Sequence, residues 1–349
     1  MNDGAMKSAD SMANFRATFG VLPNKSLRAD YYAWKLQLGS WLEGFIHLEQ
    51  RDGRDAGSAT VTGKPILVRG QEVLAFEIGD TYTHPDHRRK GVFLNAVNAC
   101  VAYATDRGAK FIYGTPNDAS LPGYVAKAEF IQIEGLRIAI LTRRITRRSL
   151  AKALQRRVRF KLLAEIGAAL IYRVRVVARA IRMIGQVPAR EAQFEQFPMV
   201  DGAWGGRDEF LFWTRRDSSF INWRYKKNPD SYRLWMVQQG DATMGYAVAK
   251  FYTKGDSYVC AICDFASIND DTKVTESLIA NIEMAANKEG VDYCEMWCSS
   301  RSPCFNVILR MGYKEIDAFP VIINAGSPMA SVLKGAGKWH FTLSDSDNI

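Results

Sequence analysis

The chain has 349 residues, which is enough for two domains with hydrophobic cores, and its hydrophobic content of 47% is ordinary for a globular protein. Charged residues interrupt every apolar stretch before it reaches about 18 residues, so we expect no membrane-spanning helix. The N-terminus lacks the apolar segment of a secretory signal, and six cysteines are few for a disulfide scaffold of this size. We therefore expect a cytoplasmic protein.

The net charge of +9 is concentrated in one segment. Thirteen lysines and arginines lie between Arg143 and Arg182 against one carboxylate, Glu165, and this charge of +12 leaves the rest of the chain at −3. Only this segment is therefore basic.

The first strands are expected before residue 84. Residues 1 to about 28 show little pattern. From Asp30, aromatic and aliphatic residues recur at helical spacing, including Trp34-Lys35, and the run then becomes strand-like. A polar turn follows over Arg51–Gly57. We expect three strands after it: Ala59–Thr62, Pro65–Arg69 and Val73–Thr83.

A basic turn and a helix follow the third of these strands. His84-Pro85-Asp86 ends the strand, and Phe93 and Val97 begin a helical pattern near Gly91. Backbone amides at a helix start bind anions, and nearby cations strengthen this binding. The turn from His87 to Phe93 therefore predicts an anion-binding site. The alternative is a surface strand, turn and helix with an incidental basic sequence.

This stretch resembles the pyrophosphate-binding turn of the Gcn5-related N-acetyltransferases (GNAT), written Q/R-x-x-G-x-G/A. Arg88, Gly91 and Phe93 stand at its defined positions, although Phe93 replaces a small residue. The resemblance implies acetyl-CoA as co-substrate. It also implies that the cofactor contacts these residues: Tyr82, Thr83, Arg88, Arg89, Lys90, Gly91, Val92, Phe93 and Asn117.

The chain after this helix is similar in order to the last third of a GNAT domain. Gly108 ends the helix, Lys110–Thr115 reads as a buried strand, and a strand is expected near Arg137–Leu141. Between these strands the family has a helix that closes with a Gly-aromatic pair. Here Glu129-Phe130 replaces that pair.

The second half repeats features of the first. Trp223-Arg224 echoes Trp34-Lys35, and Gly312-Tyr313 stands where Glu129-Phe130 stood. We predict an α/β protein with two tandem GNAT-like domains, each a mixed central sheet flanked by helices, similar to tandem GNAT proteins of envelope polysaccharide loci. The expected parts are an acyl-CoA-binding domain at 1–143, a basic helical segment at 144–190 and a degenerate GNAT-like domain at 191–349.

The second copy lacks the basic turn. Its strand Val259–Phe265 runs into a loop with Asp270 and Asp271, and then into a helix near Thr275–Asn287. Carboxylates there would repel a pyrophosphate. We therefore expect the first copy to bind the cofactor, and the second to shape the substrate cleft or to stabilise the first.

The basic segment reads as one or two long amphipathic helices, with a possible bend at Gly167. Apolar residues recur every three or four positions from Leu150 to Ile184. Three roles fit: a linker packed between the domains, a helix on an anionic membrane surface through 144–185, or a nucleic-acid contact, which only the charge favours. For the membrane role, we expect the helix to lie in the interface on the inner face of the cytoplasmic membrane.

Cysteines and carboxylates raise two further questions. Cys260-x-x-Cys263 and Cys294-x-x-x-Cys298 have spacings that zinc sites use, but they lie in strand-like runs, so we expect buried cysteines and no metal. The tail carries Asp345 and Asp347 and is either a solvated acidic end or brings an aspartate into the cleft to hold an ammonium or hydroxyl group.

The predicted reaction moves an acetyl group from acetyl-CoA to a primary amine, and the acceptor we expect is an amino sugar or a related envelope-glycan precursor. Glu77 or Asp80 would take the ammonium proton through water, and Tyr124 would protonate the leaving thiolate. A surface carboxylate on a strand is the alternative for Glu77. Two other classes stay open: a ligase resembling the Fem peptidoglycan enzymes, whose donor is a charged tRNA, and a catalytically inactive binding protein.

Overall fold

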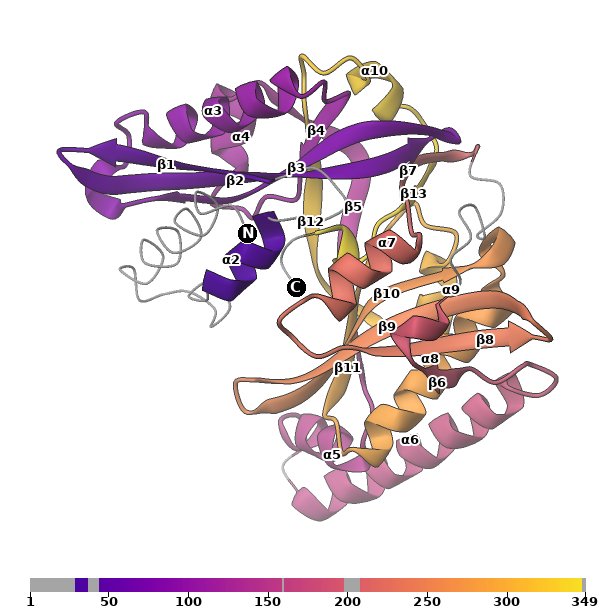
Figure 1. The fold of residues 1–349 in the computed structure, drawn as a ribbon. Coiled ribbons are helices and arrows are strands. Elements are labelled where there is room, and N and C mark those ends of the chain that lie inside the picture. Colours follow the sequence, from indigo (N-terminus) through magenta and orange to yellow (C-terminus); the bar gives the residue numbers. More distant parts are fainter. Residues whose placement is uncertain (1–28, 37–43, 159, 198–207, 347–349) are drawn as a thin grey trace.

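The computed structural model describes residues 29–36, 44–158, 160–197 and 208–346 (Figure 1). The segment 1–28, with its weak sequence pattern, lies outside the described residues. Thirteen described strands form one mixed sheet with the order β13-β7-β2-β3-β4-β12-β5-β11-β10-β9-β8-β6, and β1 pairs with β2 beside this path. Helices cover the sheet, so the predicted α/β class is confirmed.

The first half has a helix, a hairpin and then alternating strands and helices. Its elements are α2 (Ala29–Leu36), β1 (Phe45–Arg51), β2 (Arg54–Val68), β3 (Gln71–Thr83), η2 (Pro85–His87), α3 (Val92–Asp106), β4 (Phe111–Gly114), α4 (Leu121–Lys127) and β5 (Phe130–Arg144).

The segment between the halves has two helices and a short strand. These elements are α5 (Arg147–Gln155), α6 (Lys161–Arg182), β6 (Arg190–Ala192) and η3 (Phe194–Gln196).

The second half ends in a short strand and a turn of 3-10 helix. Its elements are β7 (Phe210–Thr214), α7 (Ser218–Ile221), η4 (Asn222–Lys226), β8 (Arg233–Gln239), β9 (Ala242–Lys254), β10 (Ser257–Ser267), η5 (Ile268–Asp270), α8 (Thr272–Lys288), β11 (Tyr293–Ser299), α9 (Phe305–Arg310), β12 (Lys314–Asn324), α10 (Ala330–Leu333), β13 (Lys338–His340) and η6 (Leu343–Asp345).

Three local predictions were wrong. The turn expected over Arg51–Gly57 contains only Asp52 and Gly53, whose φ angles of 53° and 72° suit a two-residue hairpin, so β2 begins earlier and runs through both of its predicted strands as one. No bend occurs at Gly167, because α6 continues through it. The helical segment breaks instead between α5 and α6.

The two halves exchange a strand. In each half an antiparallel pair, β2–β3 or β9–β10, continues into a parallel pair, β3–β4 or β10–β11. The next place beside β4 belongs to β12, and the next place beside β11 belongs to β5. β5 and β12 then pair with each other in the middle of the sheet. The sheet is therefore continuous across the chain, and the division at residues 143 and 190 stays a prediction.

Corresponding helices approach their strands in the same way. A Cβ on Gly57 of β2 would lie 2.3 Å from Val92 of α3, and one on Gly245 of β9 would lie 2.5 Å from Val274 of α8. Each glycine therefore allows the first turn of a helix to contact the sheet closely.

The six cysteines are buried and free, as predicted. In the part of the chain that the structure describes, no group of three or more His, Cys, Asp or Glu side chains is arranged to hold a metal ion.

Candidate active site

A cavity of about 1050 Å³ opens where β3 and β4 separate. The two strands pair in parallel only from Ala75 opposite Phe111 to Glu77 opposite Tyr113. β3 then continues to Thr83, whereas β4 ends at the next residue. The end of β3 therefore forms one wall of the cavity, and the loop after β4 forms the other.

A β-bulge shapes the wall made by β3. Ser58 pairs with Tyr82 and Thr60 pairs with Gly79, so β3 has one more residue than β2 at this point. Asp80 lies in the bulge with a φ of 46°. Bulges commonly redirect side chains at functional sites. Here the Asp80 carboxylate accepts from Thr60 Oγ1 at 3.1 Å and forms an ion pair described next.

Lys35 of α2 holds the Asp80 carboxylate. Its Nζ lies 2.6 Å from Asp80 Oδ2, and Lys35 is 2% exposed. Both residues line the cavity, together with Glu77. The first helix of the described chain thus contributes a buried cation to a site that the sequence assigned to later residues.

The start of α3 faces the same cavity. Gly91 is the N-cap residue, with a φ of 81°, and it has no side chain to occupy the first amide groups of the helix. Arg88 and Arg89 line the cavity beside it, whereas Lys90 is exposed and is not among the lining residues. The other predicted cofactor-binding residues all line the cavity: Tyr82, Thr83, Gly91, Val92, Phe93 and Asn117.

Phe93 packs against α4. A Cβ on Gly123 would lie 2.8 Å from the Phe93 ring, and the ring meets the Tyr124 ring edge to face at 5.1 Å. Gly123 therefore makes room for an aromatic residue where the GNAT motif has a small one. The sequence revealed the departure at Phe93 but not this compensation.

Tyr124 is buried beside the bulged strand. Its hydroxyl group donates to Thr81 Oγ1 at 3.3 Å, and 2% of its surface is exposed. Burial raises the pKa of Tyr124, although the hydrogen bond to Thr81 opposes the shift. The phenol therefore stays protonated through the neutral range, as a proton donor must.

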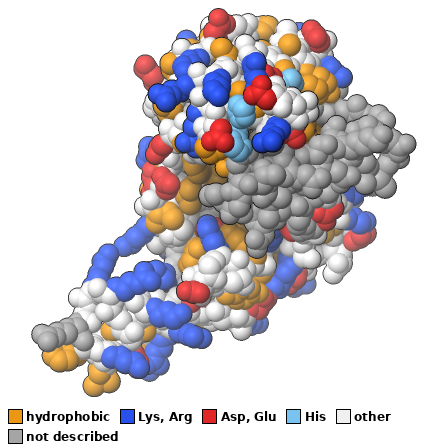
Figure 2. All heavy atoms as spheres, turned by 90° about the vertical axis from the view of Figure 1, so that its left-hand side faces the viewer, with side chains coloured by type: hydrophobic (Ala, Val, Ile, Leu, Met, Phe, Trp, Pro, Cys, Tyr) orange, Lys and Arg blue, Asp and Glu red, His pale blue; other side chains and the backbone are white. Residues whose placement is uncertain are grey.

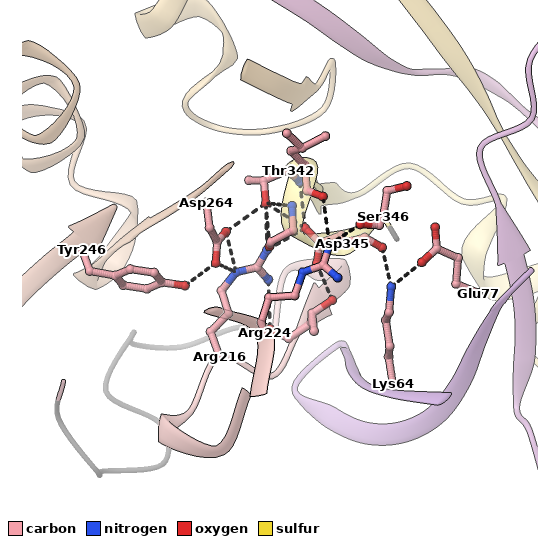
Figure 3. Close-up of polar contacts among 12 residues, drawn as sticks. Lys64, Glu77, Arg216, Arg224, Tyr246, Asp264, Thr342, Asp345 and Ser346 are labelled. Carbon is pink, nitrogen blue, oxygen red and sulfur yellow. Dashed lines mark hydrogen bonds and ion pairs between the residues drawn. The ribbon is translucent and has the colours of Figure 1, made fainter. Parts of the chain in front are cut away.

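Glu77 is a buried carboxylate paired with Lys64 (Figure 3). The same lysine Nζ donates to the backbone oxygen of Asp345 at 2.9 Å. The alternative of a surface carboxylate was therefore wrong for Glu77. Glu77 also lines the cavity, so this contact joins the cavity wall to the C-terminal segment.

Asp345 lies in a buried ionic cluster and not among the residues that line the cavity. Its carboxylate accepts from Arg216 Nη2 at 2.6 Å, while Arg216 Nε lies 3.1 Å from Asp264 Oδ1 (Figure 3). Burial opposes the positive charge of Arg216, but the two carboxylates outweigh it and raise the pKa of Arg216. Both alternatives for Asp345, a solvated end and a cleft ligand, were wrong, whereas Asp347 lies outside the described residues.

The corresponding helix start in the second half is capped by its own side chain. The Asp271 carboxylate accepts from the amide groups of Lys273 at 2.8 Å and Val274 at 3.4 Å. This carboxylate takes the place that an anion would take at the start of α8.

Several lining residues were not predicted as site residues. Lys35 and Lys127 come from helices of the first half, and Trp297, Phe319 and Ile322 come from β11 and β12 of the second half. The repeat of Trp34-Lys35 in Trp223-Arg224 was the available signal for Lys35. No sequence signal indicated the aromatic residues, because their position depends on the strand exchange.

The separated parallel strands, the bulge and the uncapped helix start together define an α/β fold of the GNAT class. Residues 8–127 match the model of a family described as acetyltransferase (GNAT) domain. No curated protein matches the chain. Residues 8–127 are therefore similar to a GNAT domain, and the described chain has a larger GNAT-like fold.

Solved structures of low sequence identity share this fold. A GCN5-related N-acetyltransferase from Anabaena variabilis has a TM-score of 0.59 at 12% identity, over 91% of this chain and 70% of its own. A probable N-acyltransferase from Enterococcus faecalis has a TM-score of 0.58 at 10% identity, over 94% of this chain and 73% of its own. Saccharomyces cerevisiae N-myristoyltransferase with bound myristoyl-CoA has a TM-score of 0.53 at 11% identity, over 85% of this chain and 74% of its own.

Proposed function

We propose that the protein is an acyl-CoA-dependent N-acyltransferase that moves an acetyl group from acetyl-CoA to a primary amine of an amino sugar or a related envelope-glycan precursor. The observation that carries this proposal is the cavity itself. It joins the uncapped start of α3, the separated edge of β3, a buried tyrosine and an aromatic wall from the second half.

The phosphate groups of acetyl-CoA would bind at the start of α3. Amide groups there point outward from Gly91, and Arg88 and Arg89 add positive charge beside them. Lys127, at the end of α4, lines the same cavity and offers a further cation. The pantetheine would then extend along β3 beyond Glu77, where β4 no longer pairs with it.

The proposed reaction has a proton donor and two possible acceptors. The amine nitrogen attacks the thioester carbonyl carbon, the carbon–sulfur bond breaks, and the thiolate takes the Tyr124 hydroxyl proton. The proton lost by the amine passes through water to Glu77 or Asp80. Each of these carboxylates is held in place by a lysine, Lys64 or Lys35.

The acceptor would lie against the second half. Trp297 and Phe319 line the cavity with their rings 4.9 Å apart. Aromatic walls with a few polar groups are typical of small-molecule sites, and the flat faces suit a sugar ring. This wall supports a glycan amine over a small aliphatic one.

An acetylation assay tests the proposal. The full-length protein is incubated with acetyl-CoA and a panel of nucleotide-linked amino sugars, amino acids and simple amines, and thiol release and acetylated product are measured. We expect turnover with an amino sugar, and we expect Trp297→Ala to raise the KM of that acceptor more than that of acetyl-CoA. Binding of acetyl-CoA without turnover on any amine would favour the inactive binding protein, and absence of binding would overturn the proposal.

Glu77→Gln and Asp80→Asn identify the base. Removal of a general base lowers the rate by about 10²–10⁴-fold. The variant that loses the acidic limb of the pH–rate profile identifies the carboxylate that takes the proton. If both variants keep this limb, neither carboxylate is the base.

A further inference from the structure

Helix α6 packs against the protein with its small and polar residues. Ala164 and Ala168 are its buried residues, and Arg175 Nη1 donates to the backbone oxygen of Arg144 at 2.8 Å. Tyr172 and Arg182 are half-buried on the same side of the helix. The face that meets the rest of the molecule is therefore not the aliphatic one.

The opposite face is an exposed apolar stripe. Its members recur every three or four positions, so they fall on one side of the helix and its C-terminal extension. Each is more than half exposed: Leu163, Ile166, Leu170, Val174, Val177, Ile181 and Ile184. An amphipathic helix of a globular protein usually turns such a stripe toward the core, so its exposure here marks an interaction surface.

Cations surround this stripe. Figure 2 shows lysine and arginine side chains over the projecting lower lobe, with hydrophobic side chains between them. The exposed cations of α5, α6 and the loop between them are Arg147, Arg148, Lys152, Arg156, Arg157, Lys161 and Arg173. Glu165 is the one carboxylate between Arg147 and Arg182 in the sequence.

We propose that α5 and α6 bind the surface of an anionic lipid bilayer, with α6 lying in the interface and its stripe at the boundary with the acyl chains. Anionic bilayers bind amphipathic helices that combine an apolar stripe with flanking cations. A second copy is a poorer occupant, because pairing through the stripe would bring two strongly basic segments together. Among the described helices none is long and apolar enough to cross a membrane, in agreement with a helix that lies in the interface.

This surface is separate from the cavity. In Figure 1, α5 and α6 form the lower end of the molecule, whereas α3 and α4 lie at the upper end. Lipid binding is therefore independent of the proposed acyltransferase reaction, and each can fail without the other.

Vesicle sedimentation with the full-length protein tests the proposal. We expect the protein to pellet with vesicles of phosphatidylglycerol and phosphatidylcholine, but not with vesicles of phosphatidylcholine alone. Binding should weaken with salt, because the Debye length falls from about 10 Å at 0.1 M to about 3 Å at 1 M.

A triple variant and a double variant separate the contributions of charge and of the stripe. Arg156→Glu, Arg157→Glu and Arg173→Glu together should weaken binding at least about 100-fold, because each cation near an anionic surface strengthens binding by roughly fivefold. Leu170→Gln and Val177→Gln remove apolar side chains that are exposed in the free protein, so they should weaken vesicle binding without lowering the melting temperature.

A matched control reverses three exposed cations at the other end of the molecule. Arg54→Glu, Lys110→Glu and Lys334→Glu change the net charge equally and should leave vesicle binding unchanged. Equal losses in the control and the α6 charge variant would overturn the proposal, as would failure of the intact protein to bind anionic vesicles at low salt. A dimer in solution that the Leu170→Gln and Val177→Gln variant dissociates would assign the stripe to a second copy instead.

Discussion

The indole rings of Trp34 and Trp223 stack on each other, with centroids 5.2 Å apart and planes inclined by 13°. Each Nε1 donates to the backbone oxygen of the other residue, at 2.8 Å from Trp34 and 3.4 Å from Trp223. The two residues hold the same position in the repeated Trp-Lys and Trp-Arg pairs. The contact is therefore reciprocal and joins the two halves at corresponding points.

Removal of either indole should destabilise the whole chain. Trp34→Ala and Trp223→Ala should each lower the free energy of unfolding by about 3–5 kcal/mol, because a large buried ring leaves a cavity. The double variant should lose less than the two single losses together, since stacked rings contribute roughly 0.5–1.5 kcal/mol to each other. Urea unfolding measures all three values. Strictly additive losses would contradict coupling between the halves.

Two substitutions at Gly91, the N-cap residue of α3, separate the effect of side-chain charge on acetyl-CoA binding from the effect of side-chain size. A Cβ there meets nothing within 4 Å, and both Asp and Asn tolerate its left-handed φ. Gly91→Asp should weaken acetyl-CoA binding about 100-fold or more, because like charges placed together cost several kcal/mol. Gly91→Asn is the matched neutral variant and should retain most of the affinity. Similar calorimetric affinities for the two variants would remove the phosphate site from this turn.

Because the Asp271 side chain caps the start of α8, we expect only the start of α3 to bind acetyl-CoA, and therefore one acetyl-CoA per chain. Asp271→Ala should lower the free energy of unfolding by about 1 kcal/mol, the usual effect of losing an N-cap. Its acetyl-CoA affinity should equal that of the unaltered protein, because this carboxylate caps a different helix. A calorimetric stoichiometry of two would show that the second half also binds the cofactor.

Tyr124→Phe should lower kcat by about 10²–10⁴-fold while the KM of acetyl-CoA changes little, as expected for loss of a general acid. A general acid is active while protonated and loses activity as the pH rises through its pKa. Burial raises the pKa of Tyr124 above its ordinary value of about 10, so this group should cause no decline in kcat below about pH 10. Thr81→Val, which removes the hydrogen-bond partner but keeps the phenol, is the control. An unchanged kcat in Tyr124→Phe would exclude the role.

The C-terminal segment should act on stability and not on cofactor binding. Asp345→Ala leaves Arg216 buried with one carboxylate partner fewer, and breaking a buried ion pair costs about 3–5 kcal/mol. Thermal unfolding measures this loss. Below the transition, acetyl-CoA affinity should be unaltered, and a large loss of affinity in the folded variant would place Asp345 in the site after all.

Local features were predictable from the sequence. The helix α3 begins close to the expected Gly91, and α8 (Thr272–Lys288) contains the range predicted for it, because helix starts depend on neighbouring residues. Glu77, Asp80 and Tyr124, which were chosen from the reaction that the GNAT resemblance implies, all line one cavity.

Features that depend on distant strands were not predictable. An alternating pattern indicates which face of a strand is buried, but not which strand lies beside it. Trp297 and Phe319 reach the cavity only because β5 and β12 exchange places. The orientation of α6 was hidden for a similar reason: the apolar period shows that a stripe exists, and packing decides which way it faces.

Because β12 lies beside β4, the cavity can be completed only after β12 has been synthesised. Phe319 and Ile322 belong to β12, near the end of the chain, yet they line a cavity built mostly from residues before Phe130. While the ribosome is still adding α8, β12 has not yet been made, so the edge of β4 lacks the strand that pairs with it in the complete chain. The site therefore comes into being late in translation, and a fragment released before Lys314 would lack part of its wall.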